Sequence, residues 1–400
     1  MNKNFILLAL TFFLWGNITA INSTLILFFF EYFTISWRQA ITINILFYIA
    51  PFVTCLPCSG LISRYGYRAV LRGSLIITMI GCLGMTAALA NYSFLAALAA
   101  IFTVATGVAS LQVVANPYLS LLSEPHRRVG NLSLASSINS MGTTLAPILI
   151  AVMLHYSPVN VAQHHEPVRW LWTGIAAFCL FILVLIWLVK LPDAPVHAAV
   201  RQPFSAVLKE RKFLYSVGAI FLYVGVEVAL ATSLVKYLTT VSHWPMAKAV
   251  SSVALYWGGA LIGRFLFGLF AHRLHVMRVF LVMTLGCAVL VVMAMLLANS
   301  IGGLLLLLTG LGNAILYPVI FSRSLQTLPQ LANVAAAVLI MAGIGGAAIP
   351  WIQAFMIEAN GVRMSFLLPV AIYLLLAGWG YMNRREERPG AVCPGLNNGD

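Results

Sequence analysis

The chain has 400 residues, of which 61% are hydrophobic and only 8% are charged. Soluble domains carry about 25% charged residues, so this chain lacks the polar surface that a water-soluble fold needs. The deficit extends along the whole chain, which excludes a soluble domain with a single membrane anchor. The net charge of +13 does not indicate nucleic-acid binding, because the basic residues lie in short gaps between apolar segments, where they set membrane topology.

Twelve apolar segments are each long enough to cross a bilayer as a helix, which takes about 20 residues. The first has no small-residue cleavage site after a short apolar core, so we interpret it as a retained helix rather than a signal peptide. We therefore expect an all-α integral membrane protein of twelve transmembrane helices. In chain order the predicted spans are 4–30, 38–63, 73–91, 94–121, 131–156, 169–191, 215–240, 247–271, 279–299, 301–322, 331–357 and 363–383.

Lysine and arginine residues are distributed unequally between the two sides of these spans. Seventeen lie on the side that also holds both chain ends, and only Arg38, Arg169, Lys248 and Arg363 lie on the other. Because cytoplasmic loops are enriched in positive residues, the asymmetry predicts a bacterial inner-membrane protein with both termini in the cytoplasm. An odd number of spans would disrupt this alternation.

The two halves of the chain are weakly similar to each other. Three pairs of motifs recur in the same order at similar offsets: 60–68 with 268–273, Pro117 with Pro318, and 142–147 with 345–350. Many secondary transporters are built from such repeats, with the substrate site between them near the middle of the membrane. We therefore predict an N-terminal six-helix bundle over 1–191, a cytoplasmic linker over 192–214, a C-terminal six-helix bundle over 215–383, and a cytoplasmic tail over 384–400.

Several motifs resemble the major facilitator superfamily and, within it, the fucose permease-like branch. Residues 59–68 resemble the loop signature between helices two and three, with Ser59 and Ser63 in place of its first glycine and its acid. The pair Trp15-Gly16 and the segments 115–118, 139–142, 221–229 and 262–265 extend the resemblance over nearly the whole chain. The resemblance implies two pseudo-symmetric bundles that rock about a central cavity, with proton flow driving sugar uptake.

The chain departs from this family pattern at three positions. Where the resemblance implies proton-coupling carboxylates in helices one and four, the chain has Ser23 and Gln112. Where it implies a sugar-contacting amide in helix five, the chain has Ser136, although the neighbouring Asn139 is kept. The resemblance therefore supports the carrier architecture more strongly than it supports fucose or proton symport.

Two charged residues lie at membrane depth, where an ionised side chain is costly and needs a reason. Glu227, the only carboxylate well inside a predicted span, is interpreted either as the structural partner of a neighbouring cation or amide, or as a protonatable gate. Arg264 lies about two helical turns from the cytoplasmic end of its span, where a structural role is the commoner one. With Asn116 of the family motif, these two residues are the candidate coupling and gating residues.

Uncharged polar residues within the spans are candidates for contact with a solute. Amides both donate and accept hydrogen bonds, as a hydroxylated ligand requires, although they also join membrane helices. Aromatic rings such as those of Tyr223 and Trp257 can stack on a sugar, although packing is their commoner role. The candidate substrate-binding residues are Asn22, Ser23, Gln112, Ser136, Asn139, Tyr256 and Gln353.

The favoured function is secondary active transport of a small polar solute, a sugar by family resemblance, through proton-coupled uptake by a monomeric carrier. An alternative keeps the fold but carries an organic anion or an anionic, siderophore-like metal chelate, because Ser23 and Gln112 remove two acids while Lys236 and Arg264 leave two cations. Export is a further alternative. The chain has no GxxxxGK[ST] phosphate loop and no metal-ligand or nucleophile–histidine motif, so we expect no enzyme activity, cofactor or metal.

Overall fold

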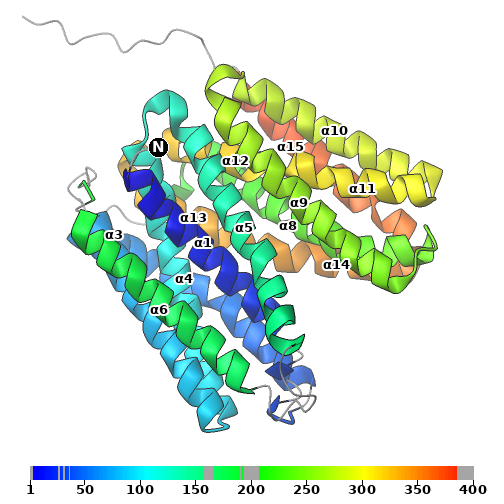
Figure 1. Ribbon diagram of the computed structural model, residues 1–400. Helices are drawn as coiled ribbons and strands as arrows, with labels where there is room; N and C mark the ends of the chain where they lie inside the picture. Colours follow the sequence, from blue (N-terminus) through cyan, green and yellow to red (C-terminus); the bar gives the residue numbers. More distant parts are fainter. Residues whose placement is uncertain are drawn as a thin grey trace, which may run out of the picture.

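The computed structural model describes residues 3–25, 28–29, 32–35, 37–155, 165–189, 191–192 and 207–384. These residues form α-helices joined by short 3-10 turns, and no strand occurs among them. The helices lie in two groups that meet at one end of the molecule and diverge toward the other (Figure 1). The all-α fold predicted from the composition is confirmed.

The first group contains the helices of the N-terminal half. α3 joins two predicted spans, 38–63 and 73–91, at Gly66, whose φ of 81° and ψ of 165° break the helix. Glycine adopts such a positive φ without steric cost, which lets the chain reverse with almost no loop. The hydroxyl of Tyr32 donates to the carbonyl of Leu89 over 2.7 Å, which holds the segment that precedes α3 beside the end of α3. The helices of this group are α1 (Lys3–Thr24), α3 (Trp37–Ala90), α4 (Phe94–Leu122), α5 (Arg128–His155) and α6 (His165–Val189).

The second group contains the helices of the C-terminal half, and two predicted spans are broken within it. The span predicted over 301–322 divides into α11 and α12 just before Pro318, and the one over 331–357 divides at the 3-10 turn η5 (Ala342–Ile344). α8 begins at Arg211, four residues before the predicted bound of 215. The helices are α8 (Arg211–Thr240), α9 (Met246–Phe270), α10 (Val276–Leu297), α11 (Ser300–Asn313), α12 (Leu316–Thr327), α13 (Ala332–Met341), α14 (Gly345–Ser365) and α15 (Leu367–Asn383).

Within the described ranges, nine helical segments are long and apolar enough to cross a membrane. The segment Ile45–Ala90 holds two predicted spans, and α5 and the shorter α15 correspond to two others, so the structure is consistent with the twelve predicted spans. Large apolar side chains such as Leu95 and Leu188 point outward from the bundle. Such an apolar exterior fits contact with lipid, where every backbone polar group is already bonded within a helix.

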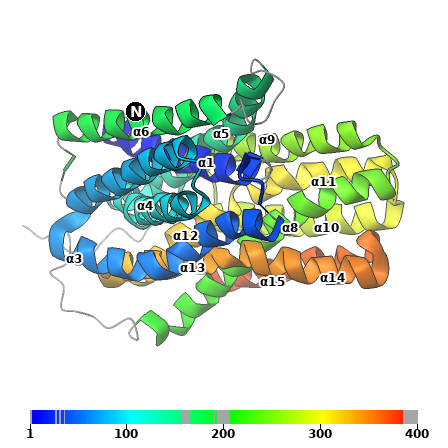
Figure 2. The ribbon, with the colours of Figure 1, turned by 90° about the horizontal axis from the view of Figure 1, so that it is seen from below.

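The two groups of helices are joined at the end where they meet. There the hydroxyl of Tyr67 donates to Oδ1 of Asn333 over 3.3 Å, and Nδ2 of Asn333 donates to Oγ of Ser63 over 2.8 Å. The 3-10 turns η1 (Pro125–Arg127) and η3 (Ala271–Arg273) also contact each other across the same boundary. Figure 2, seen from below, shows α13 of the second group lying beside α3 of the first, and the two helices contact each other. We call this junction the closed end.

Each half contains a close contact between two helices at a glycine, and the two glycines occupy corresponding positions in the two halves. A Cβ atom on Gly142 would lie 2.5 Å from the carbonyl oxygen of Phe13, so α5 packs directly on the backbone of α1. A Cβ atom on Gly345 would lie 1.9 Å from the carbonyl oxygen of Phe221, so α14 packs in the same way on α8. The repeated glycines of the sequence therefore occupy equivalent close contacts. The predicted linker lies mostly outside the described residues, and the domain bounds stay a prediction.

Substitution of Gly345 by alanine tests the closeness of this contact. We expect a lower midpoint of thermal unfolding for Gly345→Ala, with a cost of about 1–3 kcal/mol, because the added methyl group meets backbone that cannot rotate away. Gly343→Ala is the matched control, because its Cβ atom would meet no atom within 4 Å. Equal unfolding midpoints for the two variants in purified protein would contradict the packing described here.

Candidate functional site

A cavity of about 300 Å³ lies between the two groups of helices. Its wall includes residues of α1, α3, α4 and α5 from the first group and of α8, α9, α12, α13 and η5 from the second. The exposed lining surface is mostly apolar, and polar side chains interrupt it, as is usual for a small-molecule site. The polar and indole-bearing members are Trp15, Thr19, Tyr48, Gln112, Asn116, Ser136, Asn139, Thr143, Tyr223, Glu227, Trp257, Arg264 and Tyr317.

One buried ion pair borders the cavity. Nη2 of Arg264 lies 2.7 Å from Oε1 of Glu227, and each residue is only 8% exposed. Among the described lining residues these two are the only ones with a full charge, so the charges of the wall cancel. Removing two charges from water costs several kcal/mol for each ion, so such a pair persists only with good geometry and further hydrogen bonds.

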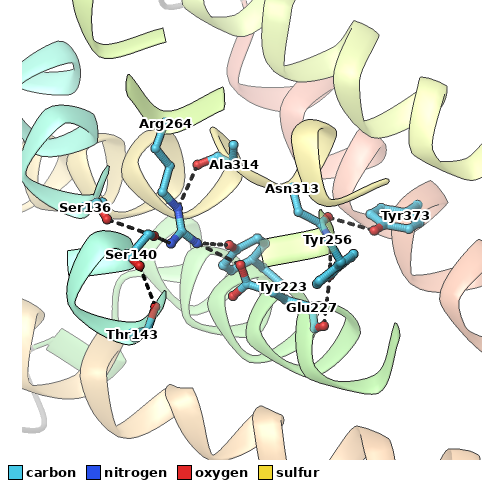
Figure 3. A network of polar contacts seen from close by, with 10 residues as sticks. All are labelled: Ser136, Ser140, Thr143, Tyr223, Glu227, Tyr256, Arg264, Asn313, Ala314 and Tyr373. Carbon is cyan, nitrogen blue, oxygen red and sulfur yellow. Dashed lines mark hydrogen bonds and ion pairs between the residues drawn. The ribbon is translucent and has the colours of Figure 1, made fainter. Parts of the chain in front are cut away.

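Arg264 has those further bonds, and they reach both groups of helices (Figure 3). Nη2 donates to the hydroxyl of Tyr223 over 3.2 Å within the second group, and Nη1 donates to Oγ of Ser140 in α5 of the first group over 2.5 Å. The hydroxyl of Ser133, also in α5, donates to the carbonyl oxygen of Arg264 over 2.8 Å. Arg264 therefore joins the cavity wall to the contact between the two groups.

A second layer of hydrogen bonds supports the ion pair from within the C-terminal group. The hydroxyl of Tyr256 donates to the backbone carbonyl of Glu227 over 3.0 Å and accepts from Nδ2 of Asn313 over 2.8 Å. Oδ1 of Asn313 accepts in turn from the hydroxyl of Tyr373 over 2.7 Å. All of these side chains are buried, and Figure 3 shows them on the far side of Glu227 from Arg264. They fix the helix position that carries the carboxylate.

The amides on the opposite wall come from α4 and α5. Nδ2 of Asn139 donates to the carbonyl of Phe12 over 3.0 Å, which ties α5 to α1, and Nδ2 of Asn116 donates to the carbonyl of Gln112 over 2.8 Å. Within the described part of the chain, Oδ1 of Asn116 is buried with no hydrogen-bond partner. The wall thus carries amide groups whose hydrogen-bonding capacity is only partly used.

The structure brings six of the ten predicted site residues to the cavity: Gln112, Asn116, Ser136, Asn139, Glu227 and Arg264. Tyr256 lies behind Glu227, as described above. Asn22 is fully buried in α1 and is not part of the lining. Gln353, in α14, is buried away from the cavity and donates to Oγ of Ser365 over 3.3 Å. The side chain of Ser23 lies outside the part of the chain that the structure describes.

Tyr223 and Trp257, the rings considered for stacking on a sugar, line the cavity, but sequence reasoning did not find the contribution of Ser140 or of the α1 residues in the wall. Ser133 and Ser140 are seven residues apart, so they lie on one face of α5, and this spacing of serines was the available signal for a polar contact between helices. Phe12, Trp15 and Thr19 line the cavity at the same helical spacing in α1. The sequence could not show whether these residues line a cavity or pack against another helix, because both arrangements give the same helical spacing.

Comparison with known proteins places the chain among transporters. The model of the Major Facilitator Superfamily matches residues 7–342. A glucose/galactose transporter of Brucella abortus biovar 1 (strain 9-941) is 30% identical over 393 residues, which are 96% of this chain and 95% of that protein. The L-fucose-proton symporter of Escherichia coli (strain K12) is 26% identical over 404 residues, covering 93% of this chain and 91% of that one.

A solved structure shares the fold. The crystal structure of the transporter FucP in the outward conformation superposes with a TM-score of 0.87 at 23% identity, and the match covers 95% of this chain and 98% of that one. The resemblance to the fucose permease-like branch that the sequence motifs indicate is confirmed.

Neutralising one member of the ion pair tests its role in stability. We expect Glu227→Gln or Arg264→Gln alone to destabilise the protein by about 3–5 kcal/mol, because each leaves an uncompensated buried group. The double variant should lose less than either single variant, since it leaves no buried charge. Thermal unfolding of the four purified proteins forms a double-mutant cycle, and strictly additive losses would show that the two side chains do not interact.

Proposed function

The chain belongs to the Major Facilitator Superfamily, and we propose that it takes up a neutral monosaccharide together with a proton. It is a multi-pass membrane transporter rather than an enzyme. The observation that carries the proposal is a cavity between two groups of helices that combines amides, aromatic rings and one internally balanced ion pair. Amides can bond the hydroxyl groups of a sugar, while rings such as that of Trp257 pack against its apolar face.

The charge of the cavity favours a neutral solute over the anion considered as an alternative. Arg264 is already paired with Glu227 and hydrogen-bonded to Tyr223 and Ser140, so its charge is not free to bind an anion. Lys236, the other cation on which that alternative depended, is not part of the lining. The names of the relatives, a glucose/galactose transporter and an L-fucose-proton symporter, support a monosaccharide.

The closed end corresponds to the cytoplasmic face in our proposal. The loops that hold Arg68, Arg127 and Arg273 lie at that end, and cytoplasmic loops of inner-membrane proteins are enriched in such residues. The cavity is then reached from the outside, and transport requires the contacts at the closed end to part. Both walls of the cavity come from one chain, which supports a monomeric carrier in the bacterial inner membrane with both termini in the cytoplasm.

The ion pair supplies the coupling step of the proposed cycle. A proton on Glu227 removes the negative charge that holds Arg264, and Arg264 also bonds Ser140 across the boundary between the groups. Protonation therefore weakens a contact that joins the two groups, and the proton stays close to the bound solute. Asn116 of α4 also lines the cavity, and its Oδ1 is buried. We propose that α4 responds through this residue when the charge of the cavity changes.

Transport by proteoliposomes with substituted amides tests the proposed binding residues. We expect Asn139→Ala and Gln112→Ala to raise the KM for galactose, glucose or fucose by about two- to tenfold, because each removes a hydrogen bond to the solute. Gln353→Ala is the control, since Gln353 is buried outside the cavity. The proposed function fails if empty vesicles accumulate these sugars as fast, or if an organic anion is taken up and neutral sugars do not compete with it.

The pH dependence of uptake tests the coupling residue. We expect the double variant Glu227→Gln/Arg264→Gln to lose accumulation against a gradient and to lose its dependence on external pH, since no group is left to take the proton. Exchange of labelled for unlabelled sugar should continue, because exchange does not require net proton movement. Accumulation driven by a proton gradient in this variant would assign the coupling proton to a different residue.

A further inference from the structure

An arginine for which the described residues supply no hydrogen-bond acceptor lies on the outer surface at the closed end. The guanidinium carbon of Arg72, in α3, lies 4.1 Å from the ring centre of Trp187 in α6. Trp187 is 62% exposed, so the stacked pair lies on the surface that faces away from the cavity. Nε of Arg72 is buried and has no hydrogen-bond partner within the described part of the chain. The stack orients the guanidinium, and no carboxylate among the described residues pairs with its charge.

A second arginine, Arg68, lies one helical turn earlier in α3 and adds a second positive charge to this surface. Nη1 of Arg68 donates to the carbonyl of Leu191 at the end of α6 over 3.3 Å. None of the ion pairs between described residues includes Arg68 or Arg72. Two neighbouring cations at the boundary of the apolar region favour an anion that can accept from planar guanidinium groups, and phosphate accepts in this way.

An apolar strip begins directly beyond this pair of arginines. Ile76, Ile80 and Leu83 are exposed and follow Arg72 on the same face of α3, at spacings of four, eight and eleven residues. Eleven residues of helix rise about 16 Å, close to half of the roughly 30 Å hydrocarbon core, and hence to the depth of one leaflet. On the neighbouring α6, the exposed Leu180 and Val184 lead along the helix to Trp187.

We propose that this surface binds one phospholipid with an anionic headgroup in the leaflet at the closed end. Its phosphate accepts hydrogen bonds from Arg68 and Arg72, and an acyl chain lies along the strip of Ile76, Ile80 and Leu83. Trp187 holds the Arg72 guanidinium at the level of the headgroup, where indole rings are favoured. None of the residues of this site lines the cavity, and the site does not depend on which solute the protein carries.

Lipid-dependent thermal unfolding of the purified protein in detergent tests the proposal. Dioleoylphosphatidylglycerol should raise the unfolding midpoint more than dioleoylphosphatidylcholine, and glycerol phosphate alone should have little effect because it lacks the acyl chains. In Arg72→Gln the half-saturating concentration of the anionic lipid should rise about fivefold, as expected for the loss of one basic contact. Trp187→Leu should weaken the response, and Arg72→Lys should keep part of it.

Arg278→Gln is the matched control, because Arg278 is exposed at the start of α10, 206 residues after Arg72 in the second half, and stacks on no ring there. Its response should equal that of the unsubstituted protein, and the midpoint of each variant without lipid reports its folding. Equal responses in Arg72→Gln and Arg278→Gln would overturn the proposal, as would an equal effect of the zwitterionic lipid.

Discussion

A charge buried in an apolar protein must be balanced nearby, and in this transporter that constraint is met at a single place in the wall of the cavity. Glu227 and Arg264 balance each other at 2.7 Å, and Tyr223 and Ser140 use further donors of the guanidinium. Because Ser140 belongs to the other group of helices, the electrostatic balance of the cavity is linked to a contact between the two groups. A change in the charge of either partner is therefore transmitted to the boundary between the two halves.

The close contacts between helices depend on residues without side chains. Gly142 and Gly345 let α5 and α14 approach the backbones of α1 and α8, which are the corresponding helices of the two halves. α1 and α8 each contribute side chains to the cavity, so the close contacts within each half also fix the positions of the lining residues. Dispersion between closely packed backbones is the main attraction available in lipid, where no hydrophobic effect drives one helix onto another.

Much of this architecture could be predicted from the sequence, because length and apolarity decide which segments cross a bilayer. The exact places where helices break could not be predicted as well: the two predicted spans of α3 meet at Gly66 with almost no loop, and α11 ends at Asn313, several residues before Pro318. At the site, charge at membrane depth singled out Glu227 and Arg264, but nothing in the sequence said that they pair. Gln353 and Asn22 are amide residues within predicted spans, as a sugar-binding residue would be, but both are buried away from the cavity. The sequence does not fix how each helix is rotated about its axis, and this rotation decides which side chains face the cavity.

Because the charges of the empty cavity cancel, the proposed cycle moves net charge across the membrane, and the membrane voltage then adds to the energy that drives solute accumulation. In the proposed cycle the empty, unprotonated cavity is neutral, while the loaded one holds a neutral solute, a protonated Glu227 and the cation of Arg264. Each inward turnover is then electrogenic and moves one positive charge, so an inside-negative voltage contributes to uptake alongside the proton gradient. A membrane potential of about 100 mV adds about 2.3 kcal/mol per elementary charge, which corresponds to a roughly 50-fold greater concentration ratio at equilibrium.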